Sequence, residues 1–236
     1  MKTLAVESSG KSCSVAVADN NIIIADIFLN NGLTHSQTLS TMIDFALISA
    51  KVDIRDIDLF AVANGPGSFT GVRIGVSNIK GLAQPLKTKC APVSTLAAIA
   101  FNLIGINSYV CTALDARCSQ FYYAIFKCDS DKAERLSPDS AGGFEEIINT
   151  VTNVLKPTDS IILAGDGAEK LFEFFNDSEF IAKLAPETLR LQRAAGVCKA
   201  ATSMLKSEYC TADDLQPFYL RPPQAERNLK KGIDNK

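Results

Sequence analysis

The sequence contains no tryptophan and a single histidine, His35, in 236 residues. Catalytic triads that use histidine, and zinc sites built from paired or clustered histidines, are therefore disfavoured. Leu39, not a second metal ligand, stands four residues after His35. Ser68 and the cysteines have no histidine partner, so Ser/His or Cys/His nucleophilic catalysis is also disfavoured. We predict a capping or surface role for His35.

Long apolar runs are also missing. The longest, residues 96–106, is interrupted by Asn102 and is too short to span a bilayer. Glu7 follows only three apolar residues, so no secretory signal is predicted. The seven cysteines are odd in number and contain no CxxC pair. Reduced thiols, a cytoplasmic location and no membrane contact are the expectation.

The chain has no excess of positive charge. It has 24 Lys and Arg residues and 26 Asp and Glu residues, which gives a net charge of −2. Proteins that bind nucleic acid over their whole surface are usually basic. Strong tRNA binding by this chain alone is therefore disfavoured. The chain is 47% hydrophobic, enough for one large domain or two smaller ones.

The chain repeats its own pattern after 108 residues. Residues 4–7 align with residues 112–115, and residues 14–18 with residues 122–126. Each half begins with an apolar strand that ends in an acid, then has a tight turn and a second strand. This pattern predicts two related α/β lobes.

We expect an N-terminal lobe over residues 1–105 and a C-terminal lobe over residues 106–220, joined near Gly105. The last segment, residues 221–236, has five basic and two acidic residues and two prolines, which predicts an extended or disordered tail. Hydrophobic spacing and capping residues predict helices over 34–50, 70–82, 94–104, 144–155 and 187–206.

A glycine-rich loop, residues 65–71, joins a buried strand to the helix 70–82. Such loops can offer backbone N–H groups to a phosphate, but this one matches neither common phosphate-binding pattern. A tight turn packed on a neighbour is the favoured interpretation. Gly71 and Gly75 share a helix face with Asn78 and Leu82, so another element could approach this face closely, within the fold or from a partner.

Two strand-end acids are candidates for a nucleotide site. Glu7 and Asp115 could face each other across a cleft and hold Mg²⁺ with nucleotide phosphates, or they could be two turn carboxylates. The turn Gly165–Gly167 follows a buried strand and could flank an adenosine, although such turns are common.

Four motifs then point to a family. Their sequences are GPGSFTGVRIG at 65–75, VSTL at 93–96, LDAR at 114–117 and PFYLR at 217–221. Together they closely resemble the TsaB (YeaZ) proteins over nearly the whole chain. The resemblance implies two RNase H-like lobes of the actin, Hsp70 and sugar-kinase class, in agreement with the repeat.

TsaB proteins assist the synthesis of threonylcarbamoyladenosine beside the anticodon of tRNA. The resemblance implies a non-catalytic subunit that pairs with the metal-bearing transferase TsaD, acts with the ATPase TsaE and meets tRNA through their complex. A homodimer could form when the chain is alone. No cofactor or metal is expected to bind tightly to this chain, although ATP or ADP could lie at an interface with the partners.

The resemblance also suggests site residues. Family dimer contacts lie on the first two helices, which suggests a partner interface of His35, Leu39, Met42, Gly71, Arg73, Gly75, Asn78 and Leu82. A vestigial nucleotide cleft would contain Glu7, Ser8, Ser9, Asp115, Gly165 and Gly167.

Two departures support the loss of catalysis. TsaD binds its metal through an HxxxH motif, whereas this chain has His35 and Leu39. The Asp-x-Gly-Thr turn of the wider superfamily is replaced by residues 7–10, Glu-Ser-Ser-Gly. The alternatives are an active ATP-dependent or peptidase-like enzyme of the same fold, or a tRNA-binding module that acts alone.

Overall fold

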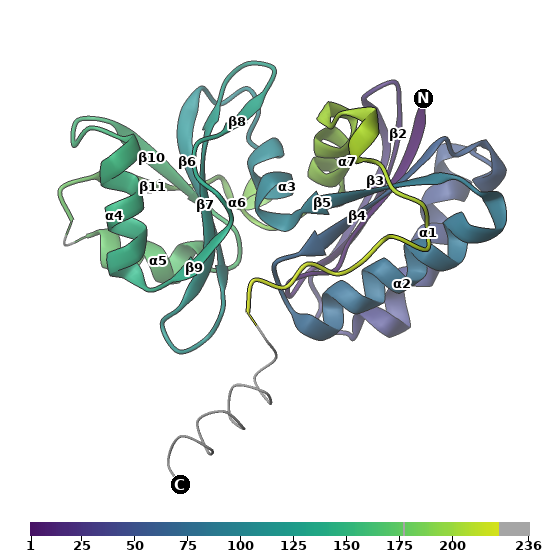
Figure 1. Ribbon diagram of the computed structural model, residues 1–236, viewed down its shortest axis with the longest axis horizontal. Coiled ribbons are helices and arrows are strands. Elements are labelled where there is room, and N and C mark those ends of the chain that lie inside the picture. The colour runs from purple at the N-terminus through teal and green to yellow at the C-terminus, as the bar shows by residue number, and fades with distance from the viewer. Residues whose placement is uncertain (177, 222–236) are drawn as a thin grey trace, which may run out of the picture.

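The computed structural model describes residues 1–176 and 178–221. It has two lobes, each built around its own β-sheet (Figure 1). The first sheet has the strand order β3-β2-β1-β4-β5. Its strands are β1 (Lys2–Glu7), β2 (Cys13–Asp19), β3 (Ile22–Leu29), β4 (Leu59–Gly65) and β5 (Lys89–Ser94).

The second sheet has the order β11-β10-β6-β7-β8, and β9 also pairs with β7. Its strands are β6 (Ser108–Asp115), β7 (Phe121–Cys128), β8 (Ala133–Arg135), β9 (Ser140–Gly142), β10 (Ser160–Ala164) and β11 (Ile181–Leu184). The short strands β8, β9 and β11 were not expected from the sequence.

The two sheets have the same topology. β1 is antiparallel to β2 and parallel to β4, and β6 is antiparallel to β7 and parallel to β10. The duplication predicted from the 108-residue shift is therefore confirmed. Glu7 and Asp115 are the last residues of the two central strands.

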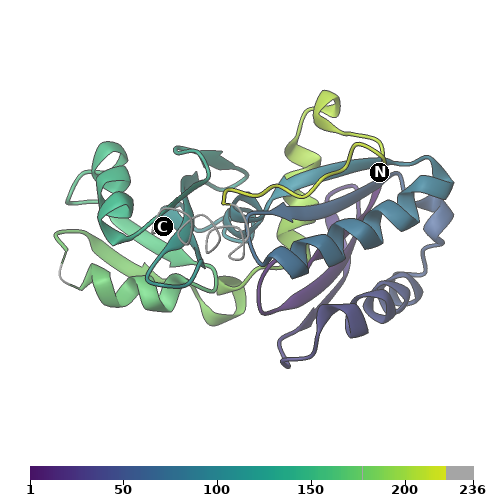
Figure 2. The ribbon, with the colours of Figure 1, turned by 60° about the horizontal axis from the view of Figure 1, so that its bottom comes forward.

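Helices cover the outer face of each sheet. In the first lobe α1 (His35–Ala50) and α2 (Phe69–Leu86) share one hydrophobic core with β1, β2 and β4. In the second lobe α4 (Phe144–Val154) and α5 (Ala168–Phe175) share a hydrophobic core with β6, β7 and β10. Figure 2 shows α1 and α2 together on one side of the first lobe. No helix among the described residues has the length and apolar character that crossing a membrane requires.

Two helices connect the lobes. α3 (Thr95–Phe101) begins where the Ser94 hydroxyl accepts a hydrogen bond from Ala97 N, as the predicted cap requires. Its Leu96 and Ile99 enter the core of the second sheet. α7 (Ala194–Ser203) packs instead on the first sheet and against α3.

The expected division of the chain is therefore corrected. α3, which lies before residue 105, packs on both lobes, since Leu96 and Ile99 enter the core of the second sheet and Ala98 that of the first. α7 and the segment 210–220 belong to the first lobe, although they lie within 106–220. Each lobe thus contributes a helix to the packing of the other. The expected tail lies, after Arg221, outside the described residues.

The predicted helix 187–206 is also two helices. α6 (Glu187–Arg190) ends before Leu191, and α7 starts at Ala194. Two side chains of the connection have tertiary roles that a continuous helix would not allow. Gln192 is buried, and the Arg193 guanidinium donates to the Asp26 carboxylate at 2.9 Å.

Glycines let α2 lie directly on the end of β1. A Cβ added at Gly71 would overlap the Ser8 carbonyl oxygen, and one at Gly75 would lie 2.6 Å from Ser8 Oγ. The Ser8 hydroxyl donates to the Gly71 carbonyl at 2.9 Å. The small-residue face therefore points into its own lobe.

This packing corrects half of the expected partner interface. Leu39, Met42, Gly71 and Gly75 are buried within the first lobe, where no partner can reach them. The burial follows from the hydrophobic stripe of α1 and from the contact between α2 and β1.

We predict opposite effects for two glycine substitutions in α2. Gly71→Ala should lower the melting temperature, because the methyl group would overlap the Ser8 backbone; overpacking typically costs about 1–3 kcal/mol. Gly81→Ala is the matched control, since nothing lies within 4 Å of its Cβ position. Alanine there should stabilise the helix by up to about 1 kcal/mol. Thermal melts that moved in the same direction for both variants would contradict the packing account.

Candidate functional site

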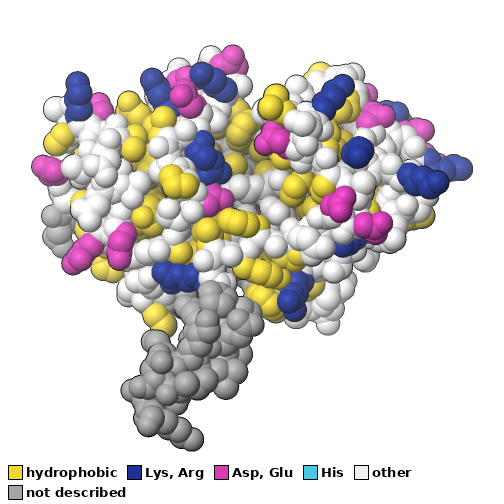
Figure 3. Space-filling view, viewed as in Figure 1, with side chains coloured by type: hydrophobic (Ala, Val, Ile, Leu, Met, Phe, Trp, Pro, Cys, Tyr) yellow, Lys and Arg dark blue, Asp and Glu magenta, His cyan; other side chains and the backbone are white. Residues whose placement is uncertain are grey.

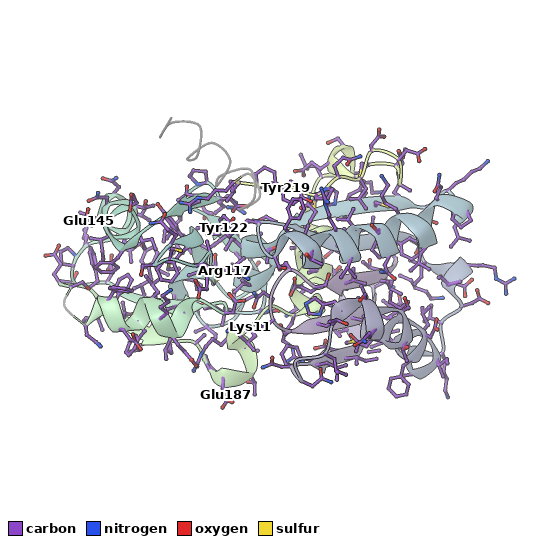
Figure 4. All side chains as sticks on the ribbon, turned by 90° about the horizontal axis from the view of Figure 1, so that it is seen from below. Lys11, Arg117, Tyr122, Glu145, Glu187 and Tyr219 are labelled. Carbon is purple, nitrogen blue, oxygen red and sulfur yellow. The ribbon has the colours of Figure 1, made fainter. Side chains whose placement is uncertain are left out.

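A cavity of about 460 Å³ lies between the lobes. Its walls come from the turn after β1, the N-terminal end of α2, the turns after β6 and β10, and the segment Phe218–Arg221. The ends of both central strands thus meet at one cleft, as expected from the duplicated fold. Figure 4 looks into this region and labels four of its residues, Lys11, Arg117, Tyr122 and Tyr219.

Glu7 is buried beneath the cleft. One carboxyl oxygen accepts a hydrogen bond from Ser9 N at 2.6 Å, and the other has no partner among the described residues. Burial, together with the charge of Asp166, raises the pKa of Glu7 to about 7, although the hydrogen bond from Ser9 N lowers it. This carboxyl is therefore largely uncharged at slightly acidic pH.

Asp115 has a different environment. It is exposed, lines the cleft, lies 3.5 Å from the Lys170 ammonium and accepts a hydrogen bond from Arg117 N at 2.8 Å. The acid whose charge acts on Glu7 is Asp166, whose own pKa burial raises. Of the two interpretations of Glu7 and Asp115, this geometry favours two turn carboxylates over a metal-binding pair, because Glu7 is buried and Asp115 is exposed and locally bound.

The expected cleft residues Gly165 and Gly167, and Gly67 in the loop 65–71, have packing roles. Gly67 lies against the turn after β1, where an added Cβ would approach the Ser9 carbonyl oxygen to 2.5 Å. A Cβ at Gly165 would overlap the Ala113 carbonyl oxygen, and one at Gly167 would lie 2.9 Å from Asp115 N. The glycine turns of both lobes thus hold the neighbouring strand end closely, which supports the tight-turn interpretation of the loop 65–71.

Gln192 and Asp166 close the floor of the cleft. Gln192 is fully buried, and a side chain at Gly10 would collide with its amide. The Asp166 carboxylate accepts a hydrogen bond from Asp115 N at 3.1 Å. Sequence reasoning placed Asp166 in a turn that could flank an adenosine but gave this acid no role of its own. It missed Gln192, which nothing in the sequence distinguishes.

His35 also contributes to this floor. Its Nε2 donates to the Gly10 carbonyl at 2.9 Å, so this nitrogen is not available as a metal ligand. No group of three or more metal-binding side chains occurs in the described ranges. His35 therefore anchors the loop after β1.

The C-terminal segment forms one rim of the cleft. Phe218 N donates to the Asn64 carbonyl at 2.7 Å. The Tyr219 ring stacks on Phe69 with 4.6 Å between the centroids, and Tyr219 OH accepts a hydrogen bond from Arg73 Nε. The guanidinium of Arg221 donates to Gln120 Oε1 of the second lobe at 2.6 Å. This segment therefore bridges the two lobes.

The outer surface of α1 and α2 is a second candidate surface. Among the expected interface residues Arg73 is exposed, and His35, Asn78 and Leu82 are half-buried. Sequence reasoning missed Phe45 and Ile48, which are 60% and 73% exposed. Their signal in the sequence is that they are large apolar residues outside the buried stripe of α1.

Comparisons with known proteins agree with this architecture. The family model described as "TsaD: tRNA N6-adenosine threonylcarbamoyltransferase" matches residues 30–229. A Bacillus subtilis protein named tRNA threonylcarbamoyladenosine biosynthesis protein TsaB is 30% identical over 96% of this chain and 96% of its own. The Escherichia coli protein of that name is 33% identical over 56% of this chain and 57% of its own.

Solved structures give the same picture. YeaZ from Pseudomonas aeruginosa is 25% identical and superposes with a TM-score of 0.75, covering 93% of this chain and 99% of its own. A Clostridium difficile activator of 2-hydroxyisocaproyl-CoA dehydratase, solved with bound ADPNP, is 10% identical and has a TM-score of 0.51 over 85% of this chain and 93% of its own. The second likeness shows the fold alone, with two lobes of the actin and sugar-kinase class. The chain belongs to the TsaB (YeaZ) family.

Proposed function

We propose that this chain is a non-catalytic, cytoplasmic subunit in the synthesis of N6-threonylcarbamoyladenosine in tRNA, which pairs with and activates a TsaD-type transferase and acts with a TsaE-type ATPase. The proposal that the chain is non-catalytic rests on the side chains that form the floor of the cleft. Glu7 is buried with a pKa of about 7, and Gln192 lies against the loop after β1.

Metal-assisted phosphate chemistry would need a different floor. A Mg²⁺ ion requires ionised, accessible oxygen ligands. Here Glu7 is inaccessible, and Asp115 is engaged by Lys170 and Arg117 N. An ATP-dependent or metallopeptidase-like enzyme would have to rearrange this floor before it could act. The geometry therefore supports a subunit that acts through its surface.

The partner surface would be the exposed side of α1 and α2. Ser40 on α1 and Asn78 on α2 are joined by a hydrogen bond of 3.1 Å, which fixes the two helices relative to each other. Phe45 and Ile48 expose large apolar area on α1, and such area is enriched at protein interfaces. The match to the transferase family model suggests that a TsaD-type partner has related helices, and related surfaces commonly pair with each other.

We predict that Ile48→Glu abolishes assembly with the TsaD homologue of the same genome while leaving the fold intact. A charge placed in the apolar centre of an interface typically costs several kcal/mol, and each 1.4 kcal/mol is a tenfold loss of affinity. Leu205→Glu is the matched control, because Leu205 is 71% exposed and Ile48 73%. Co-purification and calorimetric titration measure the effect. Equal binding by both variants would remove α1 from the interface.

We also predict that Glu7 makes the protein less stable as pH rises. The folded pKa of Glu7, about 7, lies above its ordinary 4.5, so the folded state keeps a proton that the unfolded chain releases. This contribution is complete below about pH 4.5 and is lost as pH rises through 7, in total about 3 kcal/mol.

Glu7→Gln tests this, because glutamine stays neutral. Thermal melts should nearly coincide at about pH 5, and the variant should melt higher at about pH 8. If the melting temperatures of the two proteins instead changed with pH by the same amount over this range, Glu7 would be ionised in the folded protein and available for chemistry.

A further inference from the structure

Three of the four motifs that carry the family resemblance meet at the mouth of the cleft, away from the outer side of α1. Phe69 and Arg73 come from the motif 65–75, Arg117 from LDAR, and Tyr219 from PFYLR. Phe69, Arg117 and Tyr219 line the cleft, and Arg73 lies 3.9 Å above the Phe69 ring. A packing role explains the glycines of these motifs and the contacts of Arg73 and Tyr219 with Phe69, but not the exposed Arg117.

Lys11 and Arg117 are cations that line the cleft, and the charge of Lys11 acts on Asp166. Lys11 from the first lobe and Arg117 from the second are exposed. Neither forms an ion pair within the part of the chain that the structure describes. In Figure 4 they continue a row that begins with Tyr219 and Tyr122, along the junction of the lobes. Figure 3 shows hydrophobic side chains gathered at this junction, with Lys or Arg side chains on either side.

The loop that carries Arg117 is strained. Arg117, Cys118 and Ser119 have φ values of 66°, 50° and 53°. Left-handed backbone is unfavourable for each of these three residues, because none of them is a glycine. The loop is closed by hydrogen bonds between Ala116 and Gln120 and between Gln120 and Arg117. Such strain is typical of a loop that holds a side chain for binding.

The aromatic rings offer stacking surfaces. Tyr219 has Phe69 on one face, so a further planar ring in the cleft could extend the stack. Tyr122 projects from β7 into the same cavity. The floor also holds polar atoms that have no hydrogen-bond partner among the described residues, namely Glu7 Oε2, Ser9 Oγ and the amide of Gln192.

The charges favour a phosphodiester over a compact polyphosphate. Asp115 and Asp166 line the same cavity, so clustered phosphates bound there would lie close to their carboxylates. Lys11 and Arg117 belong to opposite walls, which suits single charges spaced along a chain. Cations that follow a backbone, together with rings that stack on bases, are the usual means of binding single-stranded nucleic acid.

We propose that the mouth of this cleft binds a single-stranded segment of RNA, with its bases on Tyr219 and Tyr122 and its phosphates on Lys11 and Arg117. This inference rests on the proposed function, which supplies tRNA as the RNA. The acidic chain binds with modest, salt-dependent affinity.

The test uses the full-length chain without any partner, so it does not depend on pairing with TsaD. The probe is a labelled RNA hairpin with an adenosine-containing single-stranded loop, with a fully paired duplex and free adenosine monophosphate as competitors. The double variant Lys11→Gln, Arg117→Gln should lose affinity at least about tenfold, and its salt slope should fall by about 1.4, from two lost phosphate contacts.

Two further variants make the result specific. Lys156→Gln with Lys206→Gln removes the same charge from exposed positions outside the cleft and should bind like wild type. Tyr122→Leu keeps an apolar side chain, and it should weaken hairpin binding with a nearly unchanged salt slope. Photo-crosslinking of wild type to a hairpin with thiouridine in its loop should label the cleft, which keeps the test valid if a variant fails to fold.

Several outcomes would overturn the proposal. These are no detectable binding, equal binding of hairpin and duplex, unchanged affinity of the Lys11 and Arg117 double variant, or crosslinks only outside the cleft. Stronger competition by free adenosine monophosphate than by the hairpin would identify a mononucleotide site instead. A failure to pair with TsaD would overturn the proposed function and leave these measurements intact.

Discussion

The close contact between α2 and the end of β1 determines the rest of the structure. Gly71 and Gly75 allow the helix to lie on Ser8 without an intervening side chain, and the same device recurs in the second lobe, where Gly165 lies on Ala113. Both central strands are therefore held with their last residues at one inter-lobe cleft. The contact also buries Glu7, whose pKa rises to about 7 for that reason. A floor filled in this way cannot also present a pair of ionised carboxylates to a metal, since burial disfavours the charged form.

The floor of the cleft, its mouth and the outer side of the first lobe differ in the side chains that they expose. The floor of the cleft is closed by Gln192 and the loop after β1, whereas its mouth carries the exposed Lys11 and Arg117. On the outer side of the first lobe, Phe45 and Ile48 leave apolar area uncovered. The two-lobed structure thus places these distinctive side chains on its surfaces. Such a distribution suits a subunit that positions other molecules.

Sequence patterns predicted the fold well where the signal was local or repeated. The shift that aligned Leu4 with Thr112 correctly indicated two related sheets, and Ser94 marked the start of α3. Contacts between distant segments were not predictable. A glycine stripe looks the same whether it faces a partner or its own β-strand, so Gly71 and Gly75 were placed on the wrong surface. The return of α7 to the first lobe and the burial of Gln192 depend on tertiary packing, which periodicity does not report.

The central claim is that this chain supports tRNA modification without supplying a chemical group. The most direct measurement is threonylcarbamoyl transfer to tRNA in a reconstituted system with the TsaD and TsaE homologues and the double variant Glu7→Gln, Asp115→Asn. Glu7 is buried and Asp115 is bound to Lys170, so the account predicts transfer at the wild-type rate. A large loss of turnover with folding and assembly intact would show that these carboxyl groups take part in catalysis, which would contradict the account.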